Sequence, residues 1–297
     1  MEYVILDLEW DSVYYKEQKR FINQILQIGA VRLNSEFEII NSFEATIHSD
    51  ISKKVSTRFA QLTGITSEKM LSGVPLADAV RAFNSFSKGA EVTMTWSDSD
   101  LYAIVENEKL LENTGTGFIL NLYLDLQKLV QYKMKLLGYE SNNQVSLEAA
   151  AQFFGIDISN YDMHTALADS TVCAKLFKLC YDSQVLSSLI KDAKVPSFYE
   201  KLRFKPYPIT EINDKELDLK YFAFNCSECG ERLKRKSNWK YKNRWFAARM
   251  ECPACRRRFL GRVFAKRTYE GLVYKRRLTE IRKKGNSDEL PALPKTM

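Results

Sequence analysis

The chain has 297 residues, of which 45% are hydrophobic and 27% are charged, an ordinary composition for a folded protein with one large and one small domain. It has no apolar run of about 18 residues, and residues 1–20 lack a basic start followed by an apolar stretch, which argues against membrane spans and secretion. We therefore expect a cytoplasmic protein, or a nuclear one if the cell has a nucleus, that does not contact membranes.

Charge is unevenly distributed along the chain. Residues 1–200 hold 18 Lys and Arg against 26 Asp and Glu, and residues 201–297 hold 26 against 11, so the two parts carry −8 and +15. A strongly basic part joined to an acidic part predicts separate roles, with the basic part binding a polyanion. A solvated basic face is the alternative.

The hydrophobic pattern predicts a mixed α/β sheet flanked by helices, because three early strands precede alternating helices and strands. Strands are expected over 3–8, 24–33, 37–47, 91–95 and 121–124, and helices over 56–63, 75–87, 98–111, 126–137, 147–154 and 165–182. Prolines favour a linker over 195–220, which separates a first domain (1–194) from a second (221–284) and a disordered tail (285–297).

Two carboxylates interrupt the apolar first strand. Asp7 and Glu9 are two residues apart, so both side chains point to the same face of a strand. They would repel each other there unless a cation lies between them, and carboxylate oxygens suit Mg²⁺ or Mn²⁺. Exposed acids at the end of a strand are the alternative.

Further acidic residues follow at two places. Asp98 and Asp100 lie where a strand ends and a helix begins; Asp98 fits an N-cap, and Asp100 could turn back toward the sheet. Asp169 lies within the apolar stripe of the helix at 165–182, where an acid without a partner is costly, and His164 lies on the loop that enters this helix.

In this order, D7-L-E9, Asp100 and H164-x4-D169 resemble the motifs of the DEDDh 3′–5′ exonucleases. This superfamily includes the proofreading epsilon subunit, ribonuclease T and RNA-trimming exonucleases of the enhanced-RNAi type, and the resemblance covers residues 1–182. It implies a ribonuclease H-like sheet, two Mg²⁺ or Mn²⁺ ions bound by Asp7, Glu9, Asp100 and Asp169, and His164 as general base. Asp100 is preferred because Leu101 follows it, as in the family pattern, and Asp98 is the alternative.

Four of the six cysteines form two CxxC pairs, at Cys226 and Cys229 and at Cys252 and Cys255. Two such pairs predict one tetrahedral, structural Zn²⁺ site, and the segment looks like a zinc ribbon. A redox role is the alternative.

The residues between and just after the cysteine pairs are basic and aromatic, a composition that suits phosphate contacts and base stacking. We predict nucleic-acid contacts for Lys234, Arg235, Lys236, Trp239, Lys240, Tyr241, Lys242, Arg244, Trp245, Arg256, Arg257 and Arg258. The alternative is a hairpin whose aromatic residues cover its own zinc core.

The resemblance implies a two-metal 3′–5′ exonuclease that releases 5′-mononucleotides from single-stranded 3′ ends. The segment at 54–66 looks closer to RNA-trimming relatives, which favours RNA. The alternatives are a DNA exonuclease of the proofreading or repair type and a catalytically silent RNA-binding module. Contact with a ribosome or polymerase through the zinc ribbon is a further hypothesis.

Overall fold

The structure is a computed structural model that describes residues 1–141 and 143–281. They form two compact units, Met1–Arg203 and the residues from Phe204 onward. The tail predicted over 285–297 lies outside the described residues, as do the last three residues of the predicted second domain. Within the described ranges, none of the helices has both the length and the apolar character that crossing a membrane would require.

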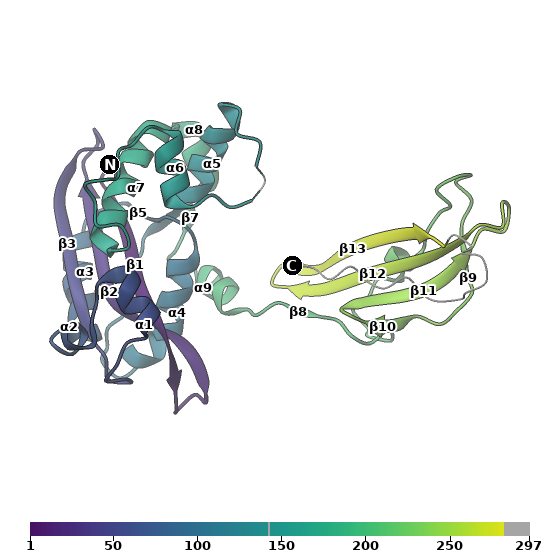
Figure 1. The fold of residues 1–297 in the computed structure, drawn as a ribbon, viewed down its shortest axis with the longest axis horizontal. Helices are drawn as coiled ribbons and strands as arrows, with labels where there is room; N and C mark the ends of the chain where they lie inside the picture. Colours follow the sequence, from purple (N-terminus) through teal and green to yellow (C-terminus); the bar gives the residue numbers. More distant parts are fainter. Residues whose placement is uncertain (142, 282–297) are drawn as a thin grey trace. The chain divides into compact units, whose positions relative to one another are not determined.

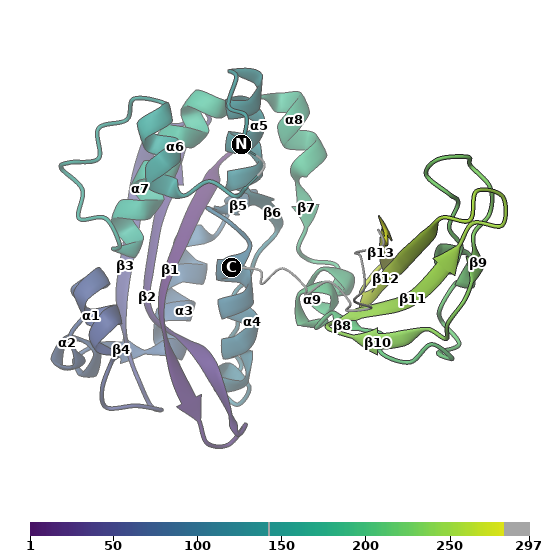
Figure 2. The same cartoon turned by 45° about the vertical axis from the view of Figure 1, so that its right-hand side comes forward.

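A seven-stranded mixed sheet forms the centre of the first unit (Figures 1 and 2). Its strand order is β4-β3-β2-β1-β5-β6-β7, with β1 antiparallel to β2 and parallel to β5. The strands are β1 (Tyr3–Tyr15), β2 (Arg20–Leu33), β3 (Ile39–His48), β4 (Val74–Pro75), β5 (Val92–Thr95), β6 (Leu122–Asp125) and β7 (Lys191–Asp192).

Helices cover both faces of this sheet, which confirms the predicted mixed α/β class. One face packs against α3 (Leu76–Ser87), α4 (Ser99–Leu111) and α9 (Pro196–Arg203). The other packs against α5 (Leu126–Leu136), α6 (Leu147–Phe153), α7 (Ala166–Cys180) and α8 (Ser183–Leu189). The short helices α1 (Thr57–Thr63) and α2 (Ser67–Leu71), with the residues between and before them, pack against Leu26 of β2 in a separate small cluster.

The alternation of β1 sets the direction of its two acids. Tyr3 and Ile5 belong to the core beneath α5–α8, whereas Val4, Leu6 and Leu8 belong to the core beneath α3 and α4. Side chains alternate along a strand, so the odd-numbered Asp7 and Glu9 continue the series of Tyr3 and Ile5 and face α7.

Strand β1 continues well beyond the predicted 3–8 and forms a long hairpin with β2. Residues 10–15 still alternate, and the turn comes only at 16–19, where Lys19 has a φ of 50°. The pairing register shifts after Glu9, which leaves Leu26 as an extra residue in β2. Such a bulge redirects neighbouring side chains, and Leu26 packs with the cluster of α1 and α2 instead of the main core.

The second unit contains a six-stranded sheet in which β10, β11, β12 and β13 lie side by side. Its elements are β8 (Tyr207–Pro208), η1 (Leu219–Phe222), β9 (Lys234–Arg235), β10 (Lys240–Lys242), β11 (Trp245–Glu251), β12 (Arg258–Thr268) and β13 (Gly271–Glu280). Its core joins one face of this sheet to apolar residues of the segment 209–233 and to two of the cysteines.

The predicted linker at 195–220 is divided between the two units, with residues up to Arg203 in the first and residues from Phe204 in the second. Helix α9 belongs to the first unit: Phe198 is buried in its core, and Arg203 forms an ion pair with Glu108. Strand β8 pairs with β12, and Ile209 is buried in the second core. The prolines therefore begin a helix and pair in a short strand, both of which are compatible with proline's missing N–H.

Candidate active site

Three carboxylates from distant parts of the chain meet at the face of β1 that α7 covers. Asp7 and Glu9 of β1 and Asp169 of α7 each offer an oxygen, and these oxygens lie within 4.8 Å of one another. Oxygen ligands bind Mg²⁺ or Ca²⁺ at about 2.0–2.6 Å, so two ligands of one ion lie up to about 4–5 Å apart. The spacing therefore fits ligands of a shared divalent cation.

Asp100 supplies a fourth carboxylate from the first turn of α4. Its side chain is 3% exposed, and Oδ1 accepts a 3.0 Å hydrogen bond from the backbone N–H of Leu8, between the two acids of β1. Asp98 is the N-cap residue of α4, is only partly buried and makes no side-chain capping bond. Of the two aspartates, Asp100 is thus the one attached to β1.

The pKa values of the four carboxylates are raised by burial and by their mutual repulsion, which a bound cation would relieve. Burial raises the pKa of Asp7 well above its usual range, and the nearby carboxylates of Asp100, Asp169 and Glu9 raise it further. Burial also raises the pKa of Glu9 to about 8 and that of Asp100 to about 7. Asp169 shifts in the same direction for the same reason.

No Lys or Arg within the described residues forms an ion pair with any of the four carboxylates. Buried like charges without a counter-charge are unfavourable, and divalent cations relieve this cost. The four carboxylates therefore suit Mg²⁺ or Mn²⁺, hard cations that prefer oxygen ligands.

His164 lies on the loop before α7, in the left-handed backbone region with a φ of 69°. Its backbone N–H donates to Oδ1 of Asp169 at 3.3 Å, which ties the loop to the cluster. Its ring, with a side chain 48% exposed, places Nε2 3.5 Å from Oε1 of Glu148 on α6. Glu148 was missed in the sequence because an exposed Glu in a first helical turn is common.

The start of α7 is held against β2 by two hydrogen bonds. The Ala166 N–H donates to Oε1 of the buried Gln27 (3.1 Å), and Oγ of Ser170 donates to the carbonyl oxygen of Gly29 (3.1 Å). A Cβ at Gly29 would lie 2.2 Å from the carbonyl carbon of Ala166. This close approach brings Asp169 over β1.

The four cysteines of the second unit converge. Sγ of Cys226 lies 3.6 Å from that of Cys255, and Sγ of Cys229 lies 3.4 Å from that of Cys252. Sulfurs around tetrahedral zinc lie about 3.8 Å apart for Zn–S bonds of about 2.3 Å. The Cys255 N–H donates to Sγ of Cys252, which lowers the pKa of that thiol to about 7. The arrangement is compatible with zinc.

The predicted nucleic-acid-binding residues divide between the two faces of the second sheet. Trp239 and Tyr241 are partly buried against the cysteine-containing core, whereas Trp245 contacts Phe264 outside it. The predicted cations are all exposed: Lys234, Arg235, Lys236, Lys240, Lys242, Arg244, Arg256, Arg257 and Arg258. Three of them are partly neutralised, because Lys236 and Arg256 pair with Glu251 and Arg257 pairs with two glutamates.

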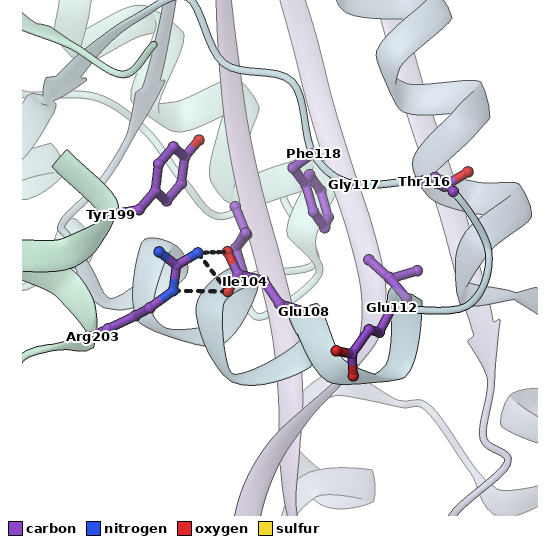
Figure 3. A pocket seen from close by; sticks show the side chains of 10 residues that line it. Ile104, Glu108, Glu112, Thr116, Gly117, Phe118, Tyr199 and Arg203 are labelled. Atoms are coloured by element: carbon purple, nitrogen blue, oxygen red, sulfur yellow. Dashed lines mark hydrogen bonds and ion pairs between the residues drawn. The ribbon is translucent and has the colours of Figure 1, made fainter. Parts of the chain in front are cut away.

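A cavity of about 370 Å³ lies between α4, the loop at 115–118 and α9 (Figure 3). The guanidinium of Arg203 forms three hydrogen bonds to the carboxylate of Glu108, at 2.7, 2.8 and 3.1 Å, and Tyr199 and Phe118 line the same space. None of the four clustered carboxylates lines it. This cavity is therefore separate from the candidate active site.

Comparison with protein families decides the class of the chain. The model of the RNase T family, described as an exonuclease, matches residues 4–177, more than half of the chain and all four clustered carboxylates. The chain belongs to this exonuclease family. The resemblance to exonucleases drawn from the motifs is therefore confirmed, and the second unit lies beyond the matched residues.

Other exonucleases resemble the same part of the chain. ERI1 exoribonuclease 2 of Xenopus laevis is 30% identical over 198 residues, 59% of this chain and 28% of the relative, so the chain spans under a third of that relative. The nuclease domain of 3′hExo, a DEDDh family member bound to rAMP, aligns with a TM-score of 0.50 at 18% identity, covering 60% of this chain and 90% of that chain. Cell-death related nuclease 4 aligns with a TM-score of 0.50 at 16% identity, covering 60% and 62%. These structures share the fold.

Proposed function

We propose that this exonuclease removes 5′-mononucleotides from the 3′ end of single-stranded nucleic acid, with RNA preferred over DNA. The observation that carries the proposal is the cluster of Asp7, Glu9, Asp100 and Asp169, in which Asp100 is buried, the other three carboxylates are partly buried and all four pKa values are raised. Mg²⁺ or Mn²⁺ ions held there would stabilise the attacking and leaving oxygens of a displacement at phosphorus.

The chain's own groups have distinct roles in this proposal. The β1 acids and Asp169 hold the metal, and the Leu8 N–H fixes the carboxylate of Asp100 beside them. His164, on a loop tied to Asp169, accepts the proton of the attacking water. The Glu148 carboxylate, with Oε1 3.5 Å from Nε2 of His164, orients the imidazole.

The second unit has a structural and a binding role in the proposal. One Zn²⁺ bound by the four cysteines holds the ends of its strands together, as small domains often require. Its predicted exposed cations, which lie between Lys234 and Arg258, contact phosphates of the substrate. Docking on a ribosome or a polymerase is the competing use of this surface.

RNA is preferred because the relative at 30% identity is named an exoribonuclease and the aligned nuclease domain was solved with rAMP. A DNA exonuclease and a catalytically silent RNA-binding protein are the competing functions. The presence of all four acids and of His164 argues against the silent protein.

The test is hydrolysis of matched RNA and DNA oligonucleotides that carry a 5′ label, in Mn²⁺ buffer. The proposal predicts a ladder shortened from the 3′ end, faster for RNA, and no ladder for Asp7→Asn. Intact RNA with the wild-type protein would refute the proposed activity, and equal or faster DNA trimming would refute the preference for RNA.

A further inference from the structure

The second sheet has one face that its own core does not cover. Phe246, Met250, Phe259 and Val263 point into the cysteine-containing core, and Gly261 lies against Met250 on the same side. Because side chains alternate, the intervening residues of β11 and β12 point to the opposite face. Trp245, Leu260 and Phe264 are apolar residues outside that core. We call this opposite side of β10–β13 the open face.

Two adjacent rows of residues cross the open face. The strand pairing joins Lys240 to Ala247, Ala247 to Arg262 and Arg262 to Arg277, which makes the first row. In the second row Lys242 lies opposite Trp245, the ring of Trp245 contacts that of Phe264 with centroids 5.8 Å apart, and Phe264 lies opposite Lys275. Two neighbouring aromatic rings thus lie between cations on both sides.

The charge of this face is unbalanced. Arg262 and Arg277 are directly opposite each other on neighbouring strands, an arrangement that destabilises a sheet. Neither they nor Lys240, Lys242 and Lys275 form an ion pair with any residue in the described ranges. The acid on this face, Glu251 of β11, is already paired with Lys236 and Arg256. An anion is the missing partner.

We infer that the open face is a platform for single-stranded nucleic acid, on which Trp245 and Phe264 stack with bases while Arg262, Arg277 and Lys275 contact phosphates. Trp245 and Phe264 are partly exposed. Accessible rings accept unpaired bases of any sequence, and flanking cations follow the backbone. A four-stranded sheet with such rings is wide enough for about two or three bases.

This platform differs from the initial prediction, which grouped Trp239 and Tyr241 with Trp245. Trp239 packs edge-on against Phe222, with centroids 5.0 Å apart, and Tyr241 packs against Phe246. Those two rings stabilise the core of the unit. The inference rests on the proposed function only in taking nucleic acid as the ligand.

The decisive variant is Arg262→Gln/Arg277→Gln in an Asp7→Asn background, which leaves the substrate intact. Anisotropy of fluorescein-labelled single-stranded RNA and DNA of one sequence is measured between 0.05 and 0.5 M salt without added divalent metal. Loss of two phosphate contacts should reduce the slope of log affinity against log salt concentration by about 1.4. This corresponds to a loss of about 25-fold in affinity at 0.1 M salt. The melting temperature should stay equal or rise, because the variant removes a repulsive pair.

The matched control is Lys220→Gln/Arg232→Gln, which removes two exposed cations from the segment that covers the other face. It should bind as the parent does.

A second position tests stacking. Trp245→Leu should weaken binding at least fivefold, whereas Trp245→Phe should keep most of the affinity but lose the nucleic-acid-induced quenching of tryptophan fluorescence.

Unchanged binding of both oligonucleotides by the arginine variant would overturn the inference, as would an equal loss in the control. Binding that needs Arg262 and Arg277 in a protein that hydrolyses nothing would refute the proposed activity and leave the platform standing. Hydrolysis by the wild-type protein, together with unchanged binding by the arginine variant, would support the proposed activity and refute the platform. Binding of an acidic protein but of neither oligonucleotide would assign the face to a protein partner.

Discussion

Replacement of Gly29 by Ala should damage the candidate active site although Gly29 bears no functional group. Its Cβ would lie 2.2 Å from the carbonyl carbon of Ala166 and 2.3 Å from the backbone nitrogen of Leu167. Ordinary contacts begin at 3.4 Å, so β2 and the start of α7 must separate by about 1.2 Å (3.4 − 2.2). Both obstructing atoms are backbone, so side-chain rotation cannot relieve the clash.

The separation has an energetic and a catalytic consequence. Overpacking of this kind costs about 1–3 kcal/mol or more. Asp169 lies one turn into α7 and would move with it away from Asp7 and Glu9. A displacement of about 1 Å of a positioning group can cost about 10²-fold in rate.

The assay compares Gly29→Ala with Gly117→Ala, whose Cβ would meet nothing within 4 Å. Urea unfolding gives stability, and oligonucleotide hydrolysis at several Mn²⁺ concentrations gives rate and metal dependence. We expect Gly29→Ala to unfold at lower urea concentration and to need more Mn²⁺ for a slower maximal rate, while Gly117→Ala matches the wild type. Wild-type activity and metal dependence in Gly29→Ala would refute the account of how α7 positions Asp169.

Three further predictions concern protonation, the general base and the cysteines. The folded-state pKa values of Asp7, Glu9 and Asp100 are raised, so the unfolded chain loses these protons at lower pH than the folded chain does. Without added Mg²⁺ or Mn²⁺, the contribution of these groups to stability should therefore be fully present below about pH 4 and be lost as pH rises through about 8. Melting curves across this range should show the loss reduced in Asp7→Asn and by added Mn²⁺, and a pH trend identical in Asp7→Asn would contradict the cause given. His164→Ala should slow single-turnover hydrolysis by about 10²–10⁴-fold. Glu148→Gln should slow it less, because the imidazole loses the carboxylate that orients it, and a wild-type rate in Glu148→Gln would remove Glu148 from the mechanism. Cys226→Ser should release zinc and expose the second unit to proteolysis while hydrolysis of a dinucleotide persists; loss of dinucleotide hydrolysis would show that the first unit depends on the second.

The sequence was sufficient for the features set by local periodicity. The two-residue spacing of Asp7 and Glu9 predicted a common face, and the structure places their oxygens together. The apolar stripe around Asp169 likewise predicted a helix face that meets the sheet. These inferences succeed because the geometry of a strand or helix is fixed over a few residues.

Features that depend on distant contacts could not be predicted in this way. Gln27 accepts a hydrogen bond from Ala166, 139 residues away, and nothing near Gln27 in the sequence indicates that partner. The bulge at Leu26 depends on the pairing register with Glu9 and Trp10. Trp245 lies on the uncovered face of the second sheet because the segment 209–233, which is distant in sequence from β12 and β13, covers the other face.

We propose that Asp7, Glu9, Asp100 and Asp169 hold catalytic divalent metal. The most direct measurement is anomalous diffraction from crystals grown with Mn²⁺ and a 5′-mononucleotide. We expect two manganese peaks among these carboxylates, with the phosphate of the nucleotide bound to them. Nucleotide bound elsewhere, with no manganese between Asp7 and Asp169, would contradict this proposal.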